Sequence, residues 1–393
     1  MKTHLINKRS LVILRYLSEV FLFIIISLYA CTSNSQEKHN HRYGERSFNY
    51  ESRSDTLTLL FVGDAMQHLP QVTNAKIEGG FDYDACFDKI RNEVRSVDIA
   101  VVNFETTLGG KPYSGYPQFS SPREYAAALK NAGFGIFLTA NNHCLDRYTK
   151  GLNRTIAALD TLGITHLGTY TDSVSRVHEY PLIIDKNNIR MAFFNYTYGT
   201  NGIGVILPSV VNYIDTVQIK ADLETAKMKG AELMIACIHW GEEYHKKPTY
   251  FQKQIATFLR REGVQLIIGA HPHVIQPMSL KKDSIGASCL IVYSLGNFIS
   301  NMQDPDTQGG AIVKVKVIKN DHGIDISDAR YALHYTQRPA HRAGKGYEVL
   351  PAASVLPFVK DSFPLLYIPM KRFVENNRHF LQENNYGVEE YIF

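Results

Sequence analysis

The sequence is poor in cysteine, with five in 393 residues. Four of them follow residue 31 and would allow three disulfide pairings, but a chain of this length can bury enough apolar surface to fold without them. Cys237 and Cys289 lie inside apolar runs, which predicts buried thiols. Cys144 adjoins a histidine, but no separate His/Asn pattern of a cysteine hydrolase accompanies it, so we do not expect a thiol nucleophile.

Neither positive nor negative side chains predominate in the sequence. The 42 Lys and Arg residues nearly balance 38 Asp and Glu residues, and no basic stripe with interleaved aromatic residues is present. We therefore expect no nucleic-acid partner, while the formal net charge of +4 tolerates an anionic ligand without requiring one. With 45% apolar and 20% charged residues, the chain has the composition of a globular protein, either one large α/β domain with additions or two domains.

No apolar run has the length of a comfortable transmembrane helix. The apolar stretch at residues 21–30 follows four basic residues and is shorter than the roughly 20 residues that span a bilayer. It ends in LYAC, which resembles a bacterial lipobox with lipidation at Cys31, although Tyr29 fits that pattern poorly, so simple secretion or an uncleaved anchor stay open. We expect a lipoprotein signal at 1–31, a polar tether at 32–55, and a membrane-anchored lipoprotein of the cell envelope.

What the sequence does have is polar residues at the ends of apolar, strand-like runs. The six clusters are Gly63-Asp64, Asn103-Phe104-Glu105, Asn141-Asn142-His143, His239 to Glu243, His271-Pro272-His273 and Asn297-Phe298. Amphipathic helical patterns, such as 250–261, lie between the runs. This alternation predicts an α/β fold with a largely parallel sheet, in which ligands bind beyond the carboxyl ends of the strands. The clusters are therefore expected on one rim.

Each cluster alone has an ordinary structural explanation. A polar residue at a strand end often caps the next helix, which fits Asp64, Asn103 or Asn141 as well as metal binding does. A lone His239 is most often a core histidine. Six such clusters at one end of one sheet nevertheless favour a shared polar site.

The candidate ligands are carboxylates, amide oxygens and imidazoles, without a thiolate. This set suits Mn, Zn or Fe, and we expect one or two divalent ions of this kind as the cofactor. Two ions about 3.5–4 Å apart can clamp a phosphoryl oxygen and generate a hydroxide nucleophile. A histidine outside the ligand set can protonate the leaving oxygen if an acid orients it, a role that suits His143 with Asp146.

Six motifs occur in order: VGDAM, VVNFETTLGG, TANNHCLDRYTKGLNRTIAALDTLGITHLG, HWGEEY, IIGAHPHVIQP and YSLGNF. Together they resemble the CapA family of capsule (poly-γ-glutamate) synthesis proteins, whose domain is similar to the calcineurin-like metallophosphoesterases. The resemblance covers residues 57–298 and implies a four-layer α/β/β/α sandwich. We place this domain at 56–340, where the alternating run 309–319 predicts a hairpin completing a second sheet, and a C-terminal appendage at 341–393.

The resemblance also implies roles for single residues. The metal ligands would be Asp64, Glu105, Asn142, His239, His271 and His273, and the acid would be His143, with Asp146 beside it. The other polar side chains of these motifs are expected to bind substrate: Asn103, Asn141, Trp240, Glu243 and Asn297.

Three positions depart from the metallophosphoesterase pattern. Met66 stands where a first-strand histidine ligand belongs, Glu105 is longer than the aspartate it replaces, and Asp146 follows His143 by three residues instead of one. His68 could replace the missing imidazole, but an ordinary surface histidine is the alternative interpretation.

The predicted function is therefore a part in the synthesis or export of a capsule polymer, with a metallophosphoesterase-like site. The substrate would be an anionic polymer or a phosphoester, and the partners would be the membrane and membrane proteins of capsule synthesis or export. Three alternatives remain: a metal-dependent phosphoesterase unrelated to capsule, a non-catalytic polymer-binding assembly factor, and a lipoprotein whose polar site is purely structural.

Overall fold

The computed structural model describes residues 55–282, 288–342 and 345–393. The predicted signal, residues 32–54 of the tether and the predicted lipidation site Cys31 lie outside these ranges. Within them, no helix combines the length and the apolar character needed to cross a membrane.

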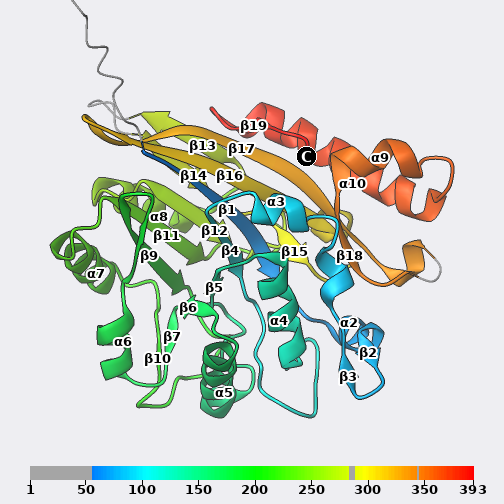
Figure 1. Cartoon of the computed structure of the whole chain (residues 1–393), viewed down its shortest axis with the longest axis horizontal. Helices are drawn as coiled ribbons and strands as arrows, with labels where there is room; N and C mark the ends of the chain where they lie inside the picture. The colour runs from blue at the N-terminus through cyan, green and yellow to red at the C-terminus, as the bar shows by residue number, and fades with distance from the viewer. Residues whose placement is uncertain (1–54, 283–287, 343–344) are drawn as a thin grey trace, which may run out of the picture. The chain divides into compact units, whose positions relative to one another are not determined.

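The first of two large sheets is built around β1 (Asp55–Ala65), near the middle of Figure 1. Its strand order is β18 (Glu348–Pro351), β17 (Gly323–Gln337), β16 (Gly309–Asn320), β1, β4 (Ile99–Asn103), β5 (Ile136–Leu138) and β6 (Thr165–Leu167), with β15 (Asn297–Ile299) beside β1 and β19 (Glu389–Glu390) beside β17. The side from β1 to β6 is parallel, and the side from β1 to β18 is antiparallel.

The second sheet has six strands. Their order is β13 (Met278–Lys282), β14 (Ser288–Val292), β12 (Leu266–Ala270), β11 (Leu233–His239), β9 (Ile189–Thr197) and β8 (Leu182–Lys186). The four inner strands are parallel and both edge strands antiparallel. Two short ladders, β2 (Lys76–Ile77) with β3 (Gly80–Phe81) and β7 (Thr169–Tyr170) with β10 (Val210–Val211), lie outside the two sheets.

Helices connect and cover these strands. The α-helices are α2 (Leu69–Asn74), α3 (Arg91–Arg95), α4 (Arg123–Ala132), α5 (Tyr148–Thr161), α6 (Ser173–Glu179), α7 (Thr216–Met228), α8 (Tyr250–Arg261), α9 (Ala352–Val359) and α10 (Pro364–Asn384), and the 3-10 helices are η1 (Asp84–Phe87), η2 (Pro305–Thr307) and η3 (Pro339–His341). Helix α8 shows how the sequence specifies them: Thr249 and Gln252 form a capping box, and Ile255 and Leu259 are buried on one face.

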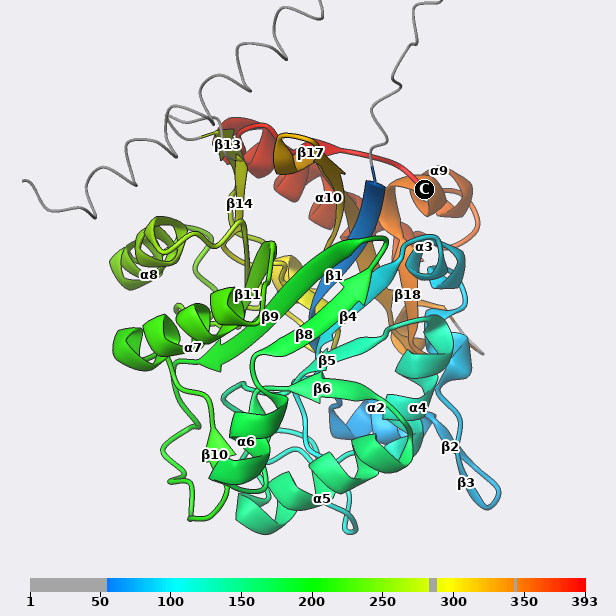
Figure 2. The same cartoon turned by 60° about the vertical axis from the view of Figure 1, so that its left-hand side comes forward.

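The two sheets pack face to face, with helices on both outer sides. Leu59 and Phe61 of β1 share a core cluster with Phe193 of β9 and Ile267 of β12. On the opposite side of β1, Leu60 packs in a second cluster with α3 and α4. Figure 2 shows these layers, with α7 and α8 on one outer side and α3 and α4 on the other. The predicted four-layer α/β/β/α arrangement is confirmed.

Two details differ from the sequence prediction. The predicted hairpin forms as β16 and β17, but β16 pairs with β1, so the hairpin extends the first sheet and not the second. We did not predict the β8–β9 hairpin, whose turn residues Asn187 and Asn188 have φ of 50° and 59°. Two asparagines between apolar runs are a signal for such a turn, because Asn tolerates positive φ.

Residues after 345 belong to the same core as the sheets. Strand β18 pairs with β17, and the buried side chains of Leu366, Met370 and Phe373 place one face of α10 in the main apolar cluster. Figure 1 shows α9 and α10 beside β17. The four described cysteines form no disulfide with one another, and Cys237 and Cys289 are buried thiols, as predicted.

Candidate metal centre

Side chains from both sheets meet at the carboxyl ends of their parallel strands. In the first sheet, Asp64 in β1 pairs in register with Asn103 at the end of β4, and Glu105 follows two residues later. In the second sheet, His239 ends β11, and His271 directly follows the neighbouring strand β12. The rim that the sequence predicted for one sheet is thus shared between two.

Three overlapping groups of side chains bring ligand atoms close enough to hold an ion. They are Glu105 with His239 and His271, Asp64 with Glu105 and His273, and Glu243 with His271 and His273, and the atoms of each group lie within 4.8 Å of one another. Glu105, His271 and His273 each belong to two of the groups, so the groups form one connected set. Five of the six predicted metal ligands are therefore in one cluster.

Asn142, the sixth predicted ligand, borders this cluster. Its Oδ1 lies 2.8 Å from Nε2 of His239, and its Nδ2 donates to Oδ1 of Asn201 at 3.2 Å. The amide oxygen of Asn142 therefore points toward a ring nitrogen of a candidate ligand.

Glu105 is the best indication that a cation fits here. Its side chain is fully buried, and neither carboxylate oxygen accepts a hydrogen bond from a described residue, the nearest imidazole nitrogens being Nε2 of His239 at 3.6 Å and Nε2 of His273 at 4.0 Å from Oε1. Burial, and next the charge of Asp64, raise the pKa of Glu105 well above its usual value. An unpaired buried carboxylate is strongly destabilising, and a bound cation would remove that penalty. The donor set therefore fits a divalent metal.

The neighbouring imidazoles are in the neutral form that metal binding requires. Burial lowers the pKa of His271 to about 3 and the pKa of His239 well below its usual value, and repulsion from other histidines acts in the same direction. Burial opposes ionisation of Asp64, but hydrogen bonds with His273 and Asn103 outweigh it and lower the pKa of Asp64. At neutral pH the cluster therefore presents an ionised Asp64 and the neutral imidazoles of His239 and His271, which suit Mn, Zn or Fe.

The tautomer of His273 follows from its partners. Its Nδ1 lies 3.0 Å from Oδ2 of Asp64 and 3.0 Å from Oδ1 of Asn297. Asn297 is oriented by its own Nδ2, which donates to the carbonyl of Thr307 at 2.8 Å. Both neighbours of Nδ1 are acceptors, so Nδ1 carries the proton and Nε2 is left for an ion.

The backbone at the two histidines is strained. His271 has a φ of 101° and His273 a φ of 59°, on either side of Pro272. Non-glycine residues in such conformations cost of order 1–3 kcal/mol each and persist where the surroundings hold them. The irregular chain that the sequence predicted around Pro272 thus directs two imidazoles into one cluster.

His143 and Asp146 form a buried pair beside the cluster. Nδ1 of His143 lies 2.7 Å from Oδ2 of Asp146, and the same oxygen accepts from the backbone of Phe119 at 2.7 Å. Burial raises the pKa of Asp146, and the hydrogen bond to His143 offsets part of that rise. The structure therefore brings together the two side chains that the sequence suggested as acid and orienting group.

Four of the five predicted substrate-binding residues are buried and use polar atoms within the protein. Nδ2 of Asn103 donates to Oδ1 of Asp64 at 2.7 Å, and Asn297 contacts His273 as described. Asn141 donates to the carbonyl of Phe104, and Nε1 of Trp240 donates to the carbonyl of Tyr293. These contacts orient ligands and loops. Glu243 differs, because its side chain is 40% exposed and belongs to one of the metal-type groups.

The position of the missing histidine ligand is occupied by a buried Met66. His68 does not take its place in the ligand groups of the described residues. Instead, His68 caps α2 with Gln71, and its Nδ1 accepts from the backbone of Asn301 at 3.3 Å. The alternative interpretation, an ordinary surface histidine, fits only in part, because His68 is half-buried and engaged by these contacts.

Three residues near the centre were missed from the sequence. The ring of Tyr198 lies 4.5 Å from that of His271, and the ring of Tyr244 lies 6.2 Å from that of His273. Asn201 holds the amide of Asn142. Tyr198 and Asn201 follow strand β9, which we did not predict, and only the turn-type dipeptide Asn201-Gly202 could have drawn attention to that loop.

Two bacterial proteins are among the solved structures that the chain resembles. The NAD nucleotidase NadN of Haemophilus influenzae is 12% identical with a TM-score of 0.47, over 84% of this chain and 68% of that one. The calcineurin-like phosphoesterase YfkN of Bacillus subtilis is 13% identical with a TM-score of 0.45, over 84% of this chain and all of that one.

Sequence comparison gives closer relatives. The chain is 27% identical over 334 residues to the capsule biosynthesis protein CapA of Bacillus anthracis, covering 80% of this chain and 75% of the relative. It is also 27% identical over 295 residues to the PGA biosynthesis protein CapA of Bacillus subtilis strain 168, covering 70% and 73%. The family model described as bacterial capsule synthesis protein PGA_cap matches residues 58–302, more than half of the chain. The chain therefore belongs to the PGA_cap family of bacterial capsule synthesis proteins.

Proposed function

We propose that this protein is a metal-dependent hydrolase of the bacterial envelope that acts on a phosphoester or an amide during synthesis or export of a capsule polymer. The observation that carries the proposal is the buried, unpaired carboxylate of Glu105 among candidate ligands. The relatives named for capsule and PGA biosynthesis support the biological setting.

Six residues would hold one or two ions of Mn, Zn or Fe: Asp64, Glu105, Asn142, His239, His271 and His273. When bound, such ions would polarise the scissile group and lower the pKa of a bound water. Asn103 and Asn297 would keep Asp64 and His273 in place through the hydrogen bonds described above.

His143 would handle the proton of the leaving group. Asp146 accepts a hydrogen bond from Nδ1 of His143 and stabilises the doubly protonated ring. Nε2 can then give its proton to the leaving oxygen or nitrogen. The rings of Phe119 and Tyr116 lie 4.6 and 6.5 Å from His143 and limit the access of water to it.

The experiment is an assay of the purified full chain loaded with Mn, Zn or Mg against phosphomonoesters, phosphodiesters and poly-γ-glutamate. We expect turnover of one substrate class, lost on chelation and restored by metal. A metal-loaded protein that turns over none of these substrates contradicts the hydrolase proposal.

One observation favours a second candidate, a polymer-binding assembly factor without turnover. Met66 stands where the metallophosphoesterase pattern has a ligand, and His68 is engaged elsewhere. In this case the metal-loaded protein would bind an anionic polymer in equilibrium dialysis and release no product.

We also propose export, lipid anchoring at Cys31, and membrane proteins of capsule synthesis or export as partners. The basic start, the short apolar stretch and LYAC support this proposal. Mass spectrometry of the mature N-terminus should find a lipid-modified Cys31, and Cys31→Ser should release the protein from the membrane fraction. An N-terminus at another position, or equal release of wild type and variant, contradicts it.

A further inference from the structure

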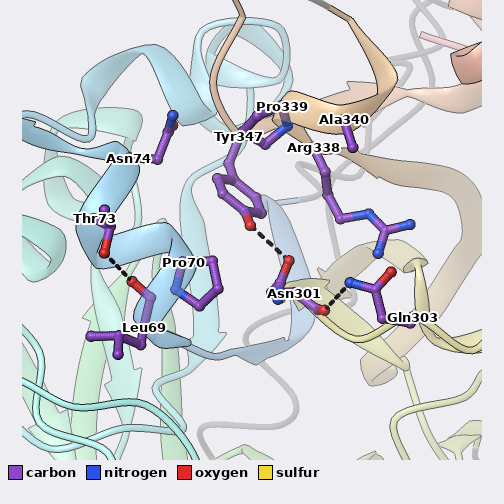
Figure 3. Close-up of a pocket in the computed structure, with 10 residues that line it drawn as sticks. All are labelled: Leu69, Pro70, Thr73, Asn74, Asn301, Gln303, Arg338, Pro339, Ala340 and Tyr347. Carbon is purple, nitrogen blue, oxygen red and sulfur yellow. Dashed lines mark hydrogen bonds between the residues drawn. The ribbon is translucent and has the colours of Figure 1, made fainter.

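A pocket lies apart from the candidate metal ligands. It is formed by α2, the loop after β15 and the segment between β17 and β18, and has a volume of about 590 Å³. Figure 3 shows Arg338 on one side of it, with Asn301 and Gln303 nearby and Leu69 and Pro339 among the apolar lining. None of the candidate metal ligands lines this pocket.

Arg338 is a buried cation without an acidic partner. It is only 9% exposed, and no carboxylate of the described residues lies within ion-pair distance of it. A guanidinium has five N–H donors, and Arg338 uses Nη1 toward the carbonyl of Met302 at 3.3 Å and Nη2 toward Nε2 of His341 at 3.1 Å. Its Nε is buried with no partner among the described residues. Arginine is almost never buried in this way unless it is paired.

The charge of Arg338 cannot be removed by losing a proton, because a guanidinium stays protonated in proteins. Its neighbour His341 cannot neutralise it either. Burial, and then the charge of Arg338, lower the pKa of His341 to about 4, so the ring is neutral. The backbone N–H of Arg338 faces Nδ1 of His341 at 3.2 Å and Nη2 faces Nε2 at 3.1 Å, and a neutral ring accepts at only one of these nitrogens. No acidic side chain of the described residues therefore balances the positive charge that Arg338 brings to the pocket.

We propose that this pocket binds a small organic monocarboxylate through Arg338. A carboxylate matches the planar fork of one guanidinium, whereas a phosphate dianion would call for a second cation, and no lysine or other arginine lines the pocket. The hydroxyl of Tyr347 donates to Oδ1 of Asn301 at 2.7 Å, which leaves the amide nitrogen of Asn301 as a further donor. Leu69 and Pro339 provide an apolar surface for the hydrocarbon part of the ligand.

This site does not depend on the proposed hydrolase function, because it shares no ligand residue with the metal centre. The test is isothermal titration of the full chain with acetate, butyrate and inorganic phosphate at constant ionic strength. We expect butyrate to bind more tightly than acetate, because of the apolar lining, and both to bind more tightly than phosphate.

The decisive variant is Arg338→Met, which removes the charge but keeps much of the side chain's length. Butyrate affinity should fall by about tenfold or more, the effect of losing a charged hydrogen bond. Arg338→Lys keeps the charge but not the planar fork, so its butyrate affinity should fall less than that of Arg338→Met. If Arg338→Met fails to fold, the affinity of Arg338→Lys compared with that of the wild type tests the proposal. The matched control is Arg342→Met, because Arg342 lies over the ring of Phe363 and not in the pocket lining.

Three results would overturn the proposal. One is the absence of carboxylate binding by the wild type, and another is equal butyrate affinity in the wild type and the folded Arg338 variants. The third is tighter binding of phosphate than of either carboxylate, which would reject the assigned ligand class.

Discussion

Glu105 and Arg338 are both buried ionisable side chains with unsatisfied polar atoms, and they differ in how that state can be relieved. Glu105 can take up a proton, and its raised pKa shows that burial favours this. Arg338 has no such route. Glu105 also lies among other ligand groups, whereas Arg338 has neutral polar neighbours. The sign of the buried charge thus indicates a ligand of opposite charge. The neighbouring groups indicate the chemical class of that ligand: a metal ion at Glu105 and a carboxylate at Arg338.

The largest effect should follow from breaking the cluster around Glu105. Replacing His271 and His273 together by Ala should remove most of the bound metal, because each of the three ligand groups contains at least one of them. The fold should survive, since its stability comes mainly from the apolar core between the sheets. Elemental analysis by mass spectrometry measures the metal, and circular dichroism checks the fold.

The control for this double variant replaces two exposed histidines, His322 and His379, by Ala. Its metal content should equal that of the wild type. Unchanged metal stoichiometry in the His271/His273 variant would mean that no ion bound by these groups neutralises Glu105. The proposed difference between a cation at Glu105 and an anion at Arg338 would then be contradicted.

The second prediction separates the acid from the ligands. His143→Ala should lower turnover by about 10²–10⁴-fold, the usual contribution of a general acid, with metal content nearly unchanged. Asp146→Asn should lower turnover less, because it removes only the orienting charge. Turnover and metal content are measured on the same samples. Loss of metal from His143→Ala would make His143 a ligand and reject its role as an acid.

Much of this arrangement could be predicted because short-range patterns specify it. Apolar runs ending in polar clusters predicted that Asp64, His239 and His271 lie at strand ends. Parallel strands place such ends on one edge of a sheet. The irregular chain around Pro272 also followed from local rules, because proline restricts the residue before it.

Contacts between distant segments could not be predicted in this way. Asn201 reaches Asn142 because the loop after β9 crosses to the other sheet, and Arg338 reaches the carbonyl of Met302 from a segment 36 residues farther along the chain. The hydrogen bonds of Asn103 and Trp240 could not be predicted either, because a polar group at a strand end can point inward as readily as toward a ligand. Side-chain direction there depends on packing that one strand does not determine.

The third prediction compares the two buried charges by pH. A carboxyl group whose pKa is higher in the folded than in the unfolded state lowers stability at pH values where the unfolded chain has released the proton that the folded chain still holds. For Glu105 in the metal-free chain, stability is therefore lost as pH rises from about 4.3, the unfolded value, toward the raised folded pKa. Metal-free Glu105→Gln avoids this loss and should be more stable than metal-free wild type at pH 7 by about 1–3 kcal/mol.

Chemical denaturation with and without Mn measures this difference. With Mn the wild type should be more stable than Glu105→Gln, because the amide of Gln is a weaker ligand than a carboxylate. Between pH 5 and pH 8, the effect of Arg338→Met on stability should vary only through His341. The charge of Arg338 lowers the pKa of His341, so the variant should gain stability relative to wild type as the pH falls toward 5. Equal stability of metal-free wild type and Glu105→Gln across this range would show that burial imposes no cost on Glu105.

The smallest effect concerns Asn201, which acts on the metal only through Asn142. Asn201 has a φ of 51°, so Asn201→Gly removes the side chain without straining the backbone. Without the hydrogen bond from Nδ2 of Asn142, the amide oxygen of Asn142 is less firmly directed, and metal affinity should fall by about tenfold. Asn188→Gly is the matched control, because Asn188 has a φ of 59° in an exposed turn and should leave metal affinity unchanged. Competition with a metal-binding dye measures both affinities. Equal affinity in both variants would show that Asn142 is held without Asn201, and the metal centre would then extend no further than the groups around Glu105.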